Sequence, residues 1–150
     1  MNKCRHSQQL KKSPAPQDFC IRIVRADYGE EGFYGIANLA GNFTMNSGSI
    51  YTKSIVSGTA PSALHHGGVN AISTVNGGYL YSAGERTVSA GGTYMPNITL
   101  NGCYLDKAPS PRPTGENVTY GSGKSLKAIT PVTRLNPVTG ETLSYGFKVE

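Results

Sequence analysis

The stretch that most resembles a chemical site is Gly121-Ser122-Gly123-Lys124-Ser125, which imitates part of a phosphate-binding loop. The full loop requires a Gly five positions before Gly123, where this chain has Val118, and a strand that leads into a helix. Pro131 limits any helix after Ser125, because proline breaks the interior of a helix. We therefore expect no nucleotide site here.

Two groups of residues could bind a metal ion. His65-His66 are adjacent, and neighbouring side chains on a strand point to opposite faces, so the pair cannot chelate from a regular strand. Cys4, His6 and Cys20 offer three ligands, whereas a structural zinc site uses four. We predict no metal and no cofactor.

The acidic residues are too sparse to suggest hydrolysis. A glycosidase needs two carboxylates a few ångströms apart, but Asp27, Glu30 and Glu31 share a Gly-rich loop, and Glu85 and Asp106 are isolated. His6, His65 and His66 are the only histidines, and none suggests a Ser/His/Asp triad. The expectation is a protein that is not an enzyme and has no catalytic residues.

The composition favours a β structure with many turns. Gly (19), Ser, Thr and Asn are abundant, only 37% of the residues are hydrophobic, and no apolar run is long enough to cross a bilayer. Met1 is followed by no apolar segment typical of a signal peptide, so we expect three free cysteines in a reducing compartment. Three Asn-x-Thr triplets, at Asn42, Asn97 and Asn117, fit the glycosylation pattern and are interpreted as chance.

A loose repeat occupies residues 45–105 and organises the chain. Its units open on apolar residues 9 to 13 positions apart, namely Met45, Ile55, Leu64, Val75, Val88 and Leu100. This spacing predicts short strands separated by tight corners. The strands could form either antiparallel hairpins, as in a meander or sandwich, or the stacked rungs of a β-solenoid.

Glycine and asparagine mark the predicted corners. We expect the doublets Gly67-Gly68, Gly77-Gly78 and Gly91-Gly92 to supply positive φ angles. Asn46, Asn76 and Asn101 lie at the same corners, and Asn tolerates the left-handed region.

The segments Val75-Asn76-Gly77-Gly78-Tyr79-Leu80-Tyr81 and Val88-Ser89-Ala90-Gly91-Gly92-Thr93 resemble the Gly-Gly repeats of AIDA-type autotransporter adhesins and related phage tail proteins. The resemblance is confined to residues 45–105 and implies a β-solenoid there. The spacing is irregular, and the second Gly is missing at Ser49, Thr59 and Cys103.

Five regions follow from this reading. We predict a basic flexible arm (1–17), an N-terminal strand and Gly-rich loop (18–44), the Gly-cornered repeat (45–105), a Pro/Gly-rich spacer (106–128) and C-terminal strands (129–150). The strands are expected at Phe19–Arg25, Ile129–Leu135, Glu141–Tyr145 and Phe147–Val149, with a turn at Asn136–Gly140. A short helical turn is expected around Ile36–Leu39, and less than about a fifth of the chain should be helical.

The whole net charge of +5 lies in the first 25 residues, which contain six basic residues and one acidic residue, Asp18. This segment is predicted to dock onto an acidic partner, and the absence of aromatic residues from residues 1–18 makes nucleic acid a less suitable one. The docking residues are Lys3, Arg5, Lys11, Lys12, Arg22 and Arg25.

Tyr79 and Tyr81 alternate with Leu80, so we expect Leu80 in the core and both tyrosines on the opposite face. There they are predicted to contact a second copy, in a homo-oligomer for which a trimer is one candidate. The function predicted is structural: a tail-fibre, spike or capsid-decorating protein of a tailed phage, made in the host cytoplasm and located in the virion beside other virion proteins. A cell-surface adhesin or matrix protein is the alternative, and nucleic-acid binding through the arm is a third.

Overall fold

The structure is a computed structural model that describes residues 23–28, 35–54, 62–67, 70–84, 86–90, 98–109, 118–136 and 139–150. For residues 23–28, 53–54 and 90 only the backbone is described. This part of the chain contains 13 strands and no helix, which confirms the prediction of a mainly β protein with little helix. The arm, residues 1–17, lies outside the described residues.

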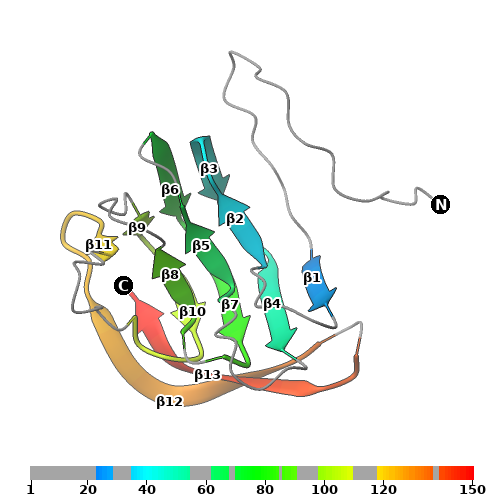
Figure 1. The fold of residues 1–150 in the computed structure, drawn as a ribbon. Helices are drawn as coiled ribbons and strands as arrows, with labels where there is room; N and C mark the ends of the chain where they lie inside the picture. Colours follow the sequence, from blue (N-terminus) through cyan, green and yellow to red (C-terminus); the bar gives the residue numbers. More distant parts are fainter. Residues whose placement is uncertain are drawn as a thin grey trace.

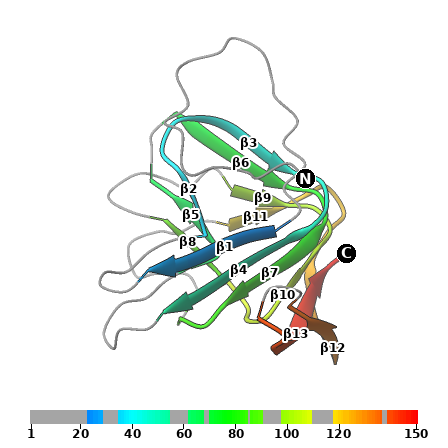
Figure 2. The same ribbon diagram turned by 90° about the vertical axis from the view of Figure 1, so that its right-hand side faces the viewer.

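The strands form three sheets, which surround a common interior as three walls (Figures 1 and 2). The six-stranded sheet has the order β1 (Ile23–Tyr28), β4 (Ser49–Ser54), β7 (Gly78–Ser82), β10 (Cys103–Leu105), β13 (Thr142–Val149) and β12 (Leu126–Leu135). The four-stranded sheet has the order β11 (Val118–Tyr120), β9 (Ile98–Leu100), β6 (Ala71–Val75) and β3 (Gly41–Met45). The three-stranded sheet has the order β2 (Ile36–Asn38), β5 (Leu64–His66) and β8 (Val88–Ala90).

Successive strands visit the three sheets in rotation. β2, β3 and β4 lie in the three-, four- and six-stranded sheets respectively, and β5–β7 and β8–β10 repeat that order. Each strand pairs in parallel with the strand three places later, from β1 with β4 to β7 with β10. The described strands of residues 45–105 are therefore not joined to one another as hairpins.

The pairing register shows why the opener spacing looked irregular. Met45, Val75 and Leu100 are direct partners in the four-stranded sheet, 30 and 25 residues apart. Leu64 and Val88 are partners in the three-stranded sheet. The five described openers thus belong to two different sheets, whereas Ile55 lies outside the described residues. Parallel pairing also extends beyond residues 45–105, to β1 and β11.

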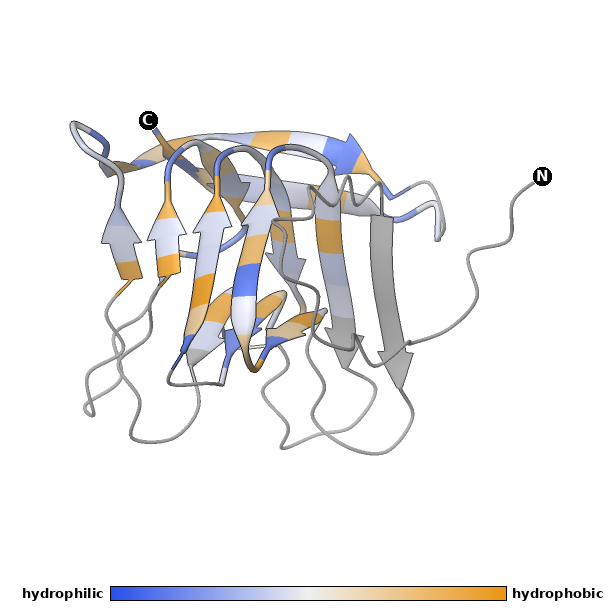
Figure 3. Cartoon of the chain, turned by 90° about the horizontal axis from the view of Figure 1, so that it is seen from above, coloured by the Kyte–Doolittle hydropathy of each residue, from blue (hydrophilic) through white to orange (hydrophobic). Residues whose placement is uncertain are grey.

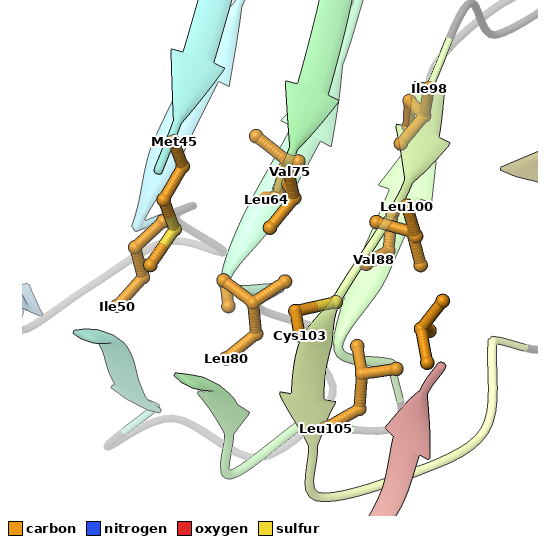
Figure 4. Close-up of a cluster of buried hydrophobic side chains, with 12 residues drawn as sticks. Met45, Ile50, Leu64, Val75, Leu80, Val88, Ile98, Leu100, Cys103 and Leu105 are labelled. Atoms are coloured by element: carbon orange, nitrogen blue, oxygen red, sulfur yellow. The ribbon is translucent and has the colours of Figure 1, made fainter. Parts of the chain in front are cut away.

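Three walls enclose one apolar core. Ile50, Leu80 and Leu105 enter it from the six-stranded sheet and are fully buried (Figure 4). Met45, Val75 and Leu100 enter it from the second sheet, and Leu64 and Val88 from the third. Burial of one such side chain stabilises a fold by roughly 1.5–3 kcal/mol, so the stacked columns hold the walls together. Figure 3 shows the apolar and polar bands that alternate along several strands.

The corners use glycine in two ways. Gly48 precedes β4, and Gly78 is the first residue of β7. Their φ angles are 97° and 102°, in a region that glycine adopts readily and other residues rarely do. Gly77 has no positive φ, but a Cβ there would lie 2.6 Å from the Asn46 carbonyl oxygen. The prediction of positive φ is wrong for Gly77 and Gly67, while Gly68, Gly91 and Gly92 lie outside the described residues.

Several predicted boundaries also change. The expected helical turn at Ile36–Leu39 is wrong, because Ile36–Asn38 pair as strand β2 with Leu64–His66. The predicted spacer contains β11 and the start of β12, and the last two predicted strands are one strand, β13. The turn after Leu135 is present, with the Gly140 amide donating to the Asn136 carbonyl at 2.8 Å.

The C-terminal hairpin closes one edge of the six-stranded sheet. β13 pairs antiparallel with β10 through Phe147 and Lys148, and β12 pairs antiparallel with β13. The register of the hairpin shifts between Ala128 and Val132, and its strands curve past β10, β7 and β4 (Figure 1). This curvature carries the far half of the hairpin over the outer face of the sheet.

Candidate functional site: an aromatic cluster and two polar ladders

A cluster of five tyrosines lies on the outer face of the six-stranded sheet. Tyr79 and Tyr104 are direct partners on β7 and β10, and their rings stack with centroids 4.7 Å apart and planes at 8°. Tyr51 and Tyr81, partners on β4 and β7, stack at 5.5 Å and 25°. Parallel pairing in register thus stacks side chains that are far apart in sequence.

The C-terminal hairpin supplies the fifth ring and covers the other four. Tyr145 of β13 meets Tyr79 edge-on at 5.1 Å and Tyr81 at 6.2 Å. The Arg134 guanidinium of β12 lies 4.2 Å from the Tyr79 ring centroid, and the Tyr51 hydroxyl donates to Glu141 Oε2 at 2.8 Å. We call Tyr51, Tyr79, Tyr81, Tyr104 and Tyr145 the tyrosine cluster.

Burial in this cluster changes the acidity of two phenols. Burial raises the pKa of Tyr145 to about 12, and the nearby Asp106 adds to the rise. Burial, with Asp106 and Glu141, also raises the pKa of Tyr81. Both phenols therefore stay protonated at neutral pH.

The structure places Leu80 and its neighbours as their alternation predicts. Leu80 is fully buried in the core, whereas Tyr79 and Tyr81 lie in the tyrosine cluster on the opposite face. The tyrosines are half-buried against the hairpin of their own chain. The contact with a second copy stays a prediction. The hairpin of the same chain already buries part of both rings, so less ring area remains for a second copy.

An asparagine ladder runs along a corner of the fold. Asn101 Nδ2 donates to Asn76 Oδ1 at 2.6 Å, and Asn76 Nδ2 donates to Asn46 Oδ1 at 2.8 Å. These three residues do not have positive φ angles, so our interpretation of them as left-handed residues is wrong. They occupy the corner because their amides link successive rungs. Gly121 ends the ladder, since a Cβ there would lie 2.0 Å from Asn101 Oδ1.

A threonine ladder lies beside it on the outer face of the four-stranded sheet. Thr44, Thr74, Thr99 and Thr119 are successive partners, and the Thr99 and Thr119 hydroxyls lie 3.1 Å apart. This ladder was not among the features predicted from the sequence, although its signal is present as Thr, an apolar residue and Asn at 44–46, 74–76 and 99–101. The threonines of the three Asn-x-Thr triplets, Thr44, Thr99 and Thr119, are all rungs of this ladder. Asn97 and Asn117 themselves lie outside the described residues.

A buried histidine and two serines form a polar chain on the three-stranded sheet. His65 Nδ1 lies 2.9 Å from Ser89 Oγ, which lies 2.6 Å from Ser62 Oγ. Ser62 donates its proton to the Leu64 carbonyl, so a consistent assignment has Ser89 donating to Ser62 and His65 donating to Ser89. In that arrangement His65 does not accept the Ser89 proton, and the arrangement does not activate a serine nucleophile.

The acidic and cysteine candidates also have structural partners. Asp106 accepts hydrogen bonds from Thr87 and Lys107, which joins β10 to the segment that enters β8. Cys103 is fully buried in the core, and burial raises the pKa of its thiol to about 12, so it is a poor nucleophile and metal ligand at neutral pH.

The phosphate-loop imitation forms a turn between two strands. The Lys124 amide donates to the Gly121 carbonyl at 2.8 Å, and strand β12 follows in place of the helix that a phosphate-binding loop requires. In the described part of the chain, no three His, Cys, Asp or Glu residues are placed to hold a metal.

Of the six predicted docking residues of the basic segment, the structure describes Arg25 alone. Lys3, Arg5, Lys11, Lys12 and Arg22 lie outside the described residues, as do Cys4, His6 and Cys20. Arg25 lies on β1, which pairs it with Tyr51, and only its backbone is described.

Comparisons with family models, with curated proteins and with solved structures found no match. Within the described ranges, no helix is long and apolar enough to cross a membrane.

Proposed function

We propose that the three-walled body is a β-solenoid and that the chain is a non-enzymatic structural protein. The observation that carries this proposal is the stacking of like residues on successive rungs: the asparagine ladder, the threonine ladder and the two tyrosine pairs. Such ladders reinforce the contact between one coil and the next, which is what a stiff projecting element requires. Of the side chains that could suggest chemistry, His65 bonds to Ser89, and Asp106 bonds to Thr87 and Lys107.

Removal of one whole coil tests the solenoid. Deleting residues 46–75 joins Met45 to Asn76, and because Met45 and Val75 are register partners, the remaining strands keep their columns. We expect the shortened protein to retain its β circular dichroism and a cooperative thermal transition. Deleting residues 46–60 removes about half a coil and should abolish folding. If both deletions had the same effect, the coil would not be the structural unit.

We further propose that this solenoid is a tail-fibre, spike or capsid-decorating subunit of a tailed phage, located in the virion as a homo-oligomer. Support comes from the basic segment at one end of the chain and from the Gly/Ser/Thr/Asn-rich rungs. The alternative, a cell-surface adhesin or matrix protein, uses the same stiff body.

Quantitative mass spectrometry of purified phage particles and of host envelopes separates these two roles. The virion role predicts a fixed number of copies for each particle, and the same particles should lose this protein when residues 1–17 are deleted, while the β body of the deleted form stays folded. Enrichment in the envelope with none in particles would contradict the virion role and favour the adhesin.

A further inference from the structure

We propose that Tyr79 and Tyr104 are a modification site, at which one-electron oxidants couple the two rings into a dityrosine bond. The proposal does not depend on a virion role. It rests on the geometry of one pair of rings and on the difference between that pair and the other tyrosines of the cluster.

The two rings are already placed for coupling. Tyr79 and Tyr104 are direct partners on adjacent parallel strands, which lie roughly 4.8 Å apart in any sheet. Their ring planes differ by 8° and their centroids are 4.7 Å apart, so the two rings are stacked and nearly parallel. Coupling joins the two rings at their edges, so both side chains must approach and rotate out of the stack, but the register already holds them opposite each other.

The coupling is a two-electron oxidation of the two phenols. Each phenol loses one electron to the oxidant and its hydroxyl proton to water, which gives two phenoxyl radicals. Their unpaired electrons form one carbon–carbon bond between the ring carbons next to the hydroxyl-bearing carbons. The hydrogen on each bonded carbon then moves to the phenoxyl oxygen, which restores both phenols. The net loss is two hydrogen atoms, and one hydrogen peroxide molecule accepts them and becomes two water molecules.

Accessibility favours this pair over the other contacts. Tyr79 and Tyr104 are only partly buried under the hairpin, so part of each residue is open to solvent and to a small oxidant. Tyr145 is 1% exposed and Tyr51 is 3% exposed. The Tyr51–Tyr81 pair is also more distant, at 5.5 Å, and less parallel.

Such a bond would join β7 covalently to β10, the strand on which the C-terminal hairpin pairs. It would therefore fix the last two rungs of the six-stranded sheet beneath the hairpin. An oxidising environment would convert a stacked contact into a permanent one.

The test treats the full-length protein, at low concentration, with a peroxidase and hydrogen peroxide. Trypsin cleaves after Arg86, which separates Tyr79 from Tyr104 into different peptides. We expect the monomer to acquire dityrosine fluorescence and to yield these two peptides linked, with a mass two hydrogens below their sum. Fragmentation of the linked pair should assign the bond to Tyr79 and Tyr104.

Tyr79→Phe and Tyr104→Phe keep the rings and the packing, and each should lose this linked pair. Tyr120→Phe, which changes a half-buried tyrosine outside the cluster, is the matched control and should retain it. Oxidation in urea should also remove the preference for this pair. A main product at Tyr81 or Tyr145, only intermolecular links, or a yield of the linked peptides in either Phe variant equal to that of the wild type would overturn the proposal.

Discussion

The outer faces of the six-stranded and four-stranded sheets are both built from ladders, but only one of them is covered. Large aromatic rings line the first, and the chain places its own hairpin over them through Tyr145, Leu143 and Arg134. Small polar residues line the second, with Thr44 and Thr74 partly exposed and Asn46 and Asn76 exposed. Ring area left in water is costly, whereas hydroxyls and amides are well solvated. The kind of side chain in a ladder therefore decides whether the fold must cover it.

The core beneath the covered face should tolerate change least. Leu80→Ser removes a fully buried side chain from the central column and leaves a hydroxyl in an apolar cavity. Leu→Ala changes in cores cost about 2–5 kcal/mol, and the buried hydroxyl adds to that cost. We expect Leu80→Ser to unfold the protein, as measured by circular dichroism. A cooperative transition near the wild-type temperature would show that this column does not support the fold.

Removal of both rings of the covered face should loosen the hairpin and spare the core. Tyr79→Ser with Tyr81→Ser removes two stacked pairs and the contacts with Tyr145 and Arg134. Because an aromatic pair contributes roughly 0.5–1.5 kcal/mol beyond area burial, we expect a loss of about 2–4 kcal/mol. Hydrogen exchange should accelerate in β12 and β13 before it does so in β6.

The same double variant sharpens the predicted second-copy contact. If these rings also contact another subunit, sedimentation should show weaker assembly at temperatures where the variant is still folded. Unchanged assembly would assign the tyrosines to the hairpin alone.

Alkaline pH should weaken the covered face and its core selectively. Tyr145 has a folded pKa of about 12 against an ordinary value of 10.0, so the unfolded chain loses this proton first as pH rises. The contribution of Tyr145 to the free energy of unfolding is complete below about pH 10 and is lost as pH rises towards 12. Its size is about 1.4 kcal/mol for each unit of pKa difference between the folded and unfolded chain. Urea unfolding at a series of pH values measures it. Tyr145→Phe, which cannot ionise, should reduce the dependence of the free energy of unfolding on pH. Burial also raises the pKa of Cys103 to about 12, and this thiol accounts for the part of the loss that begins near pH 9. An identical slope in Tyr145→Phe would contradict the assignment.

The uncovered face should show the smallest effect. Asn76→Ala removes two side-chain hydrogen bonds of the asparagine ladder, both exposed to solvent. Because a typical hydrogen bond contributes about 0.5–1.5 kcal/mol, we expect a loss of roughly 1 kcal/mol in urea unfolding. Asn42→Ala, which changes an exposed residue of β3 outside the ladder, is the control. A loss above that of the tyrosine double variant would reverse the ranking of the two faces.

The sequence by itself determined the secondary-structure class and the direction of individual side chains. Frequent glycine and the absence of helical periodicity predicted a strand-rich chain. The alternation Tyr79-Leu80-Tyr81 assigned Leu80 to the core and the two tyrosines to the outer face. These features are local, because a strand places successive side chains on opposite faces whatever lies beside it.

Only the tertiary structure decided which residues meet. The parallel rungs pair residues 20 to 30 positions apart, and the interval changes from one rung to the next, as for Met45, Val75 and Leu100. A search for one fixed spacing therefore could not reveal the asparagine and threonine ladders, whose signal is the recurring triplet of Thr, an apolar residue and Asn. The cover over the tyrosines includes Arg134, Leu143 and Tyr145, which no pattern within residues 45–105 could indicate, because the curvature of the hairpin brings them there. Direction of a side chain is set by its neighbours in sequence, whereas its partner is set by the register and curvature of strands far along the chain.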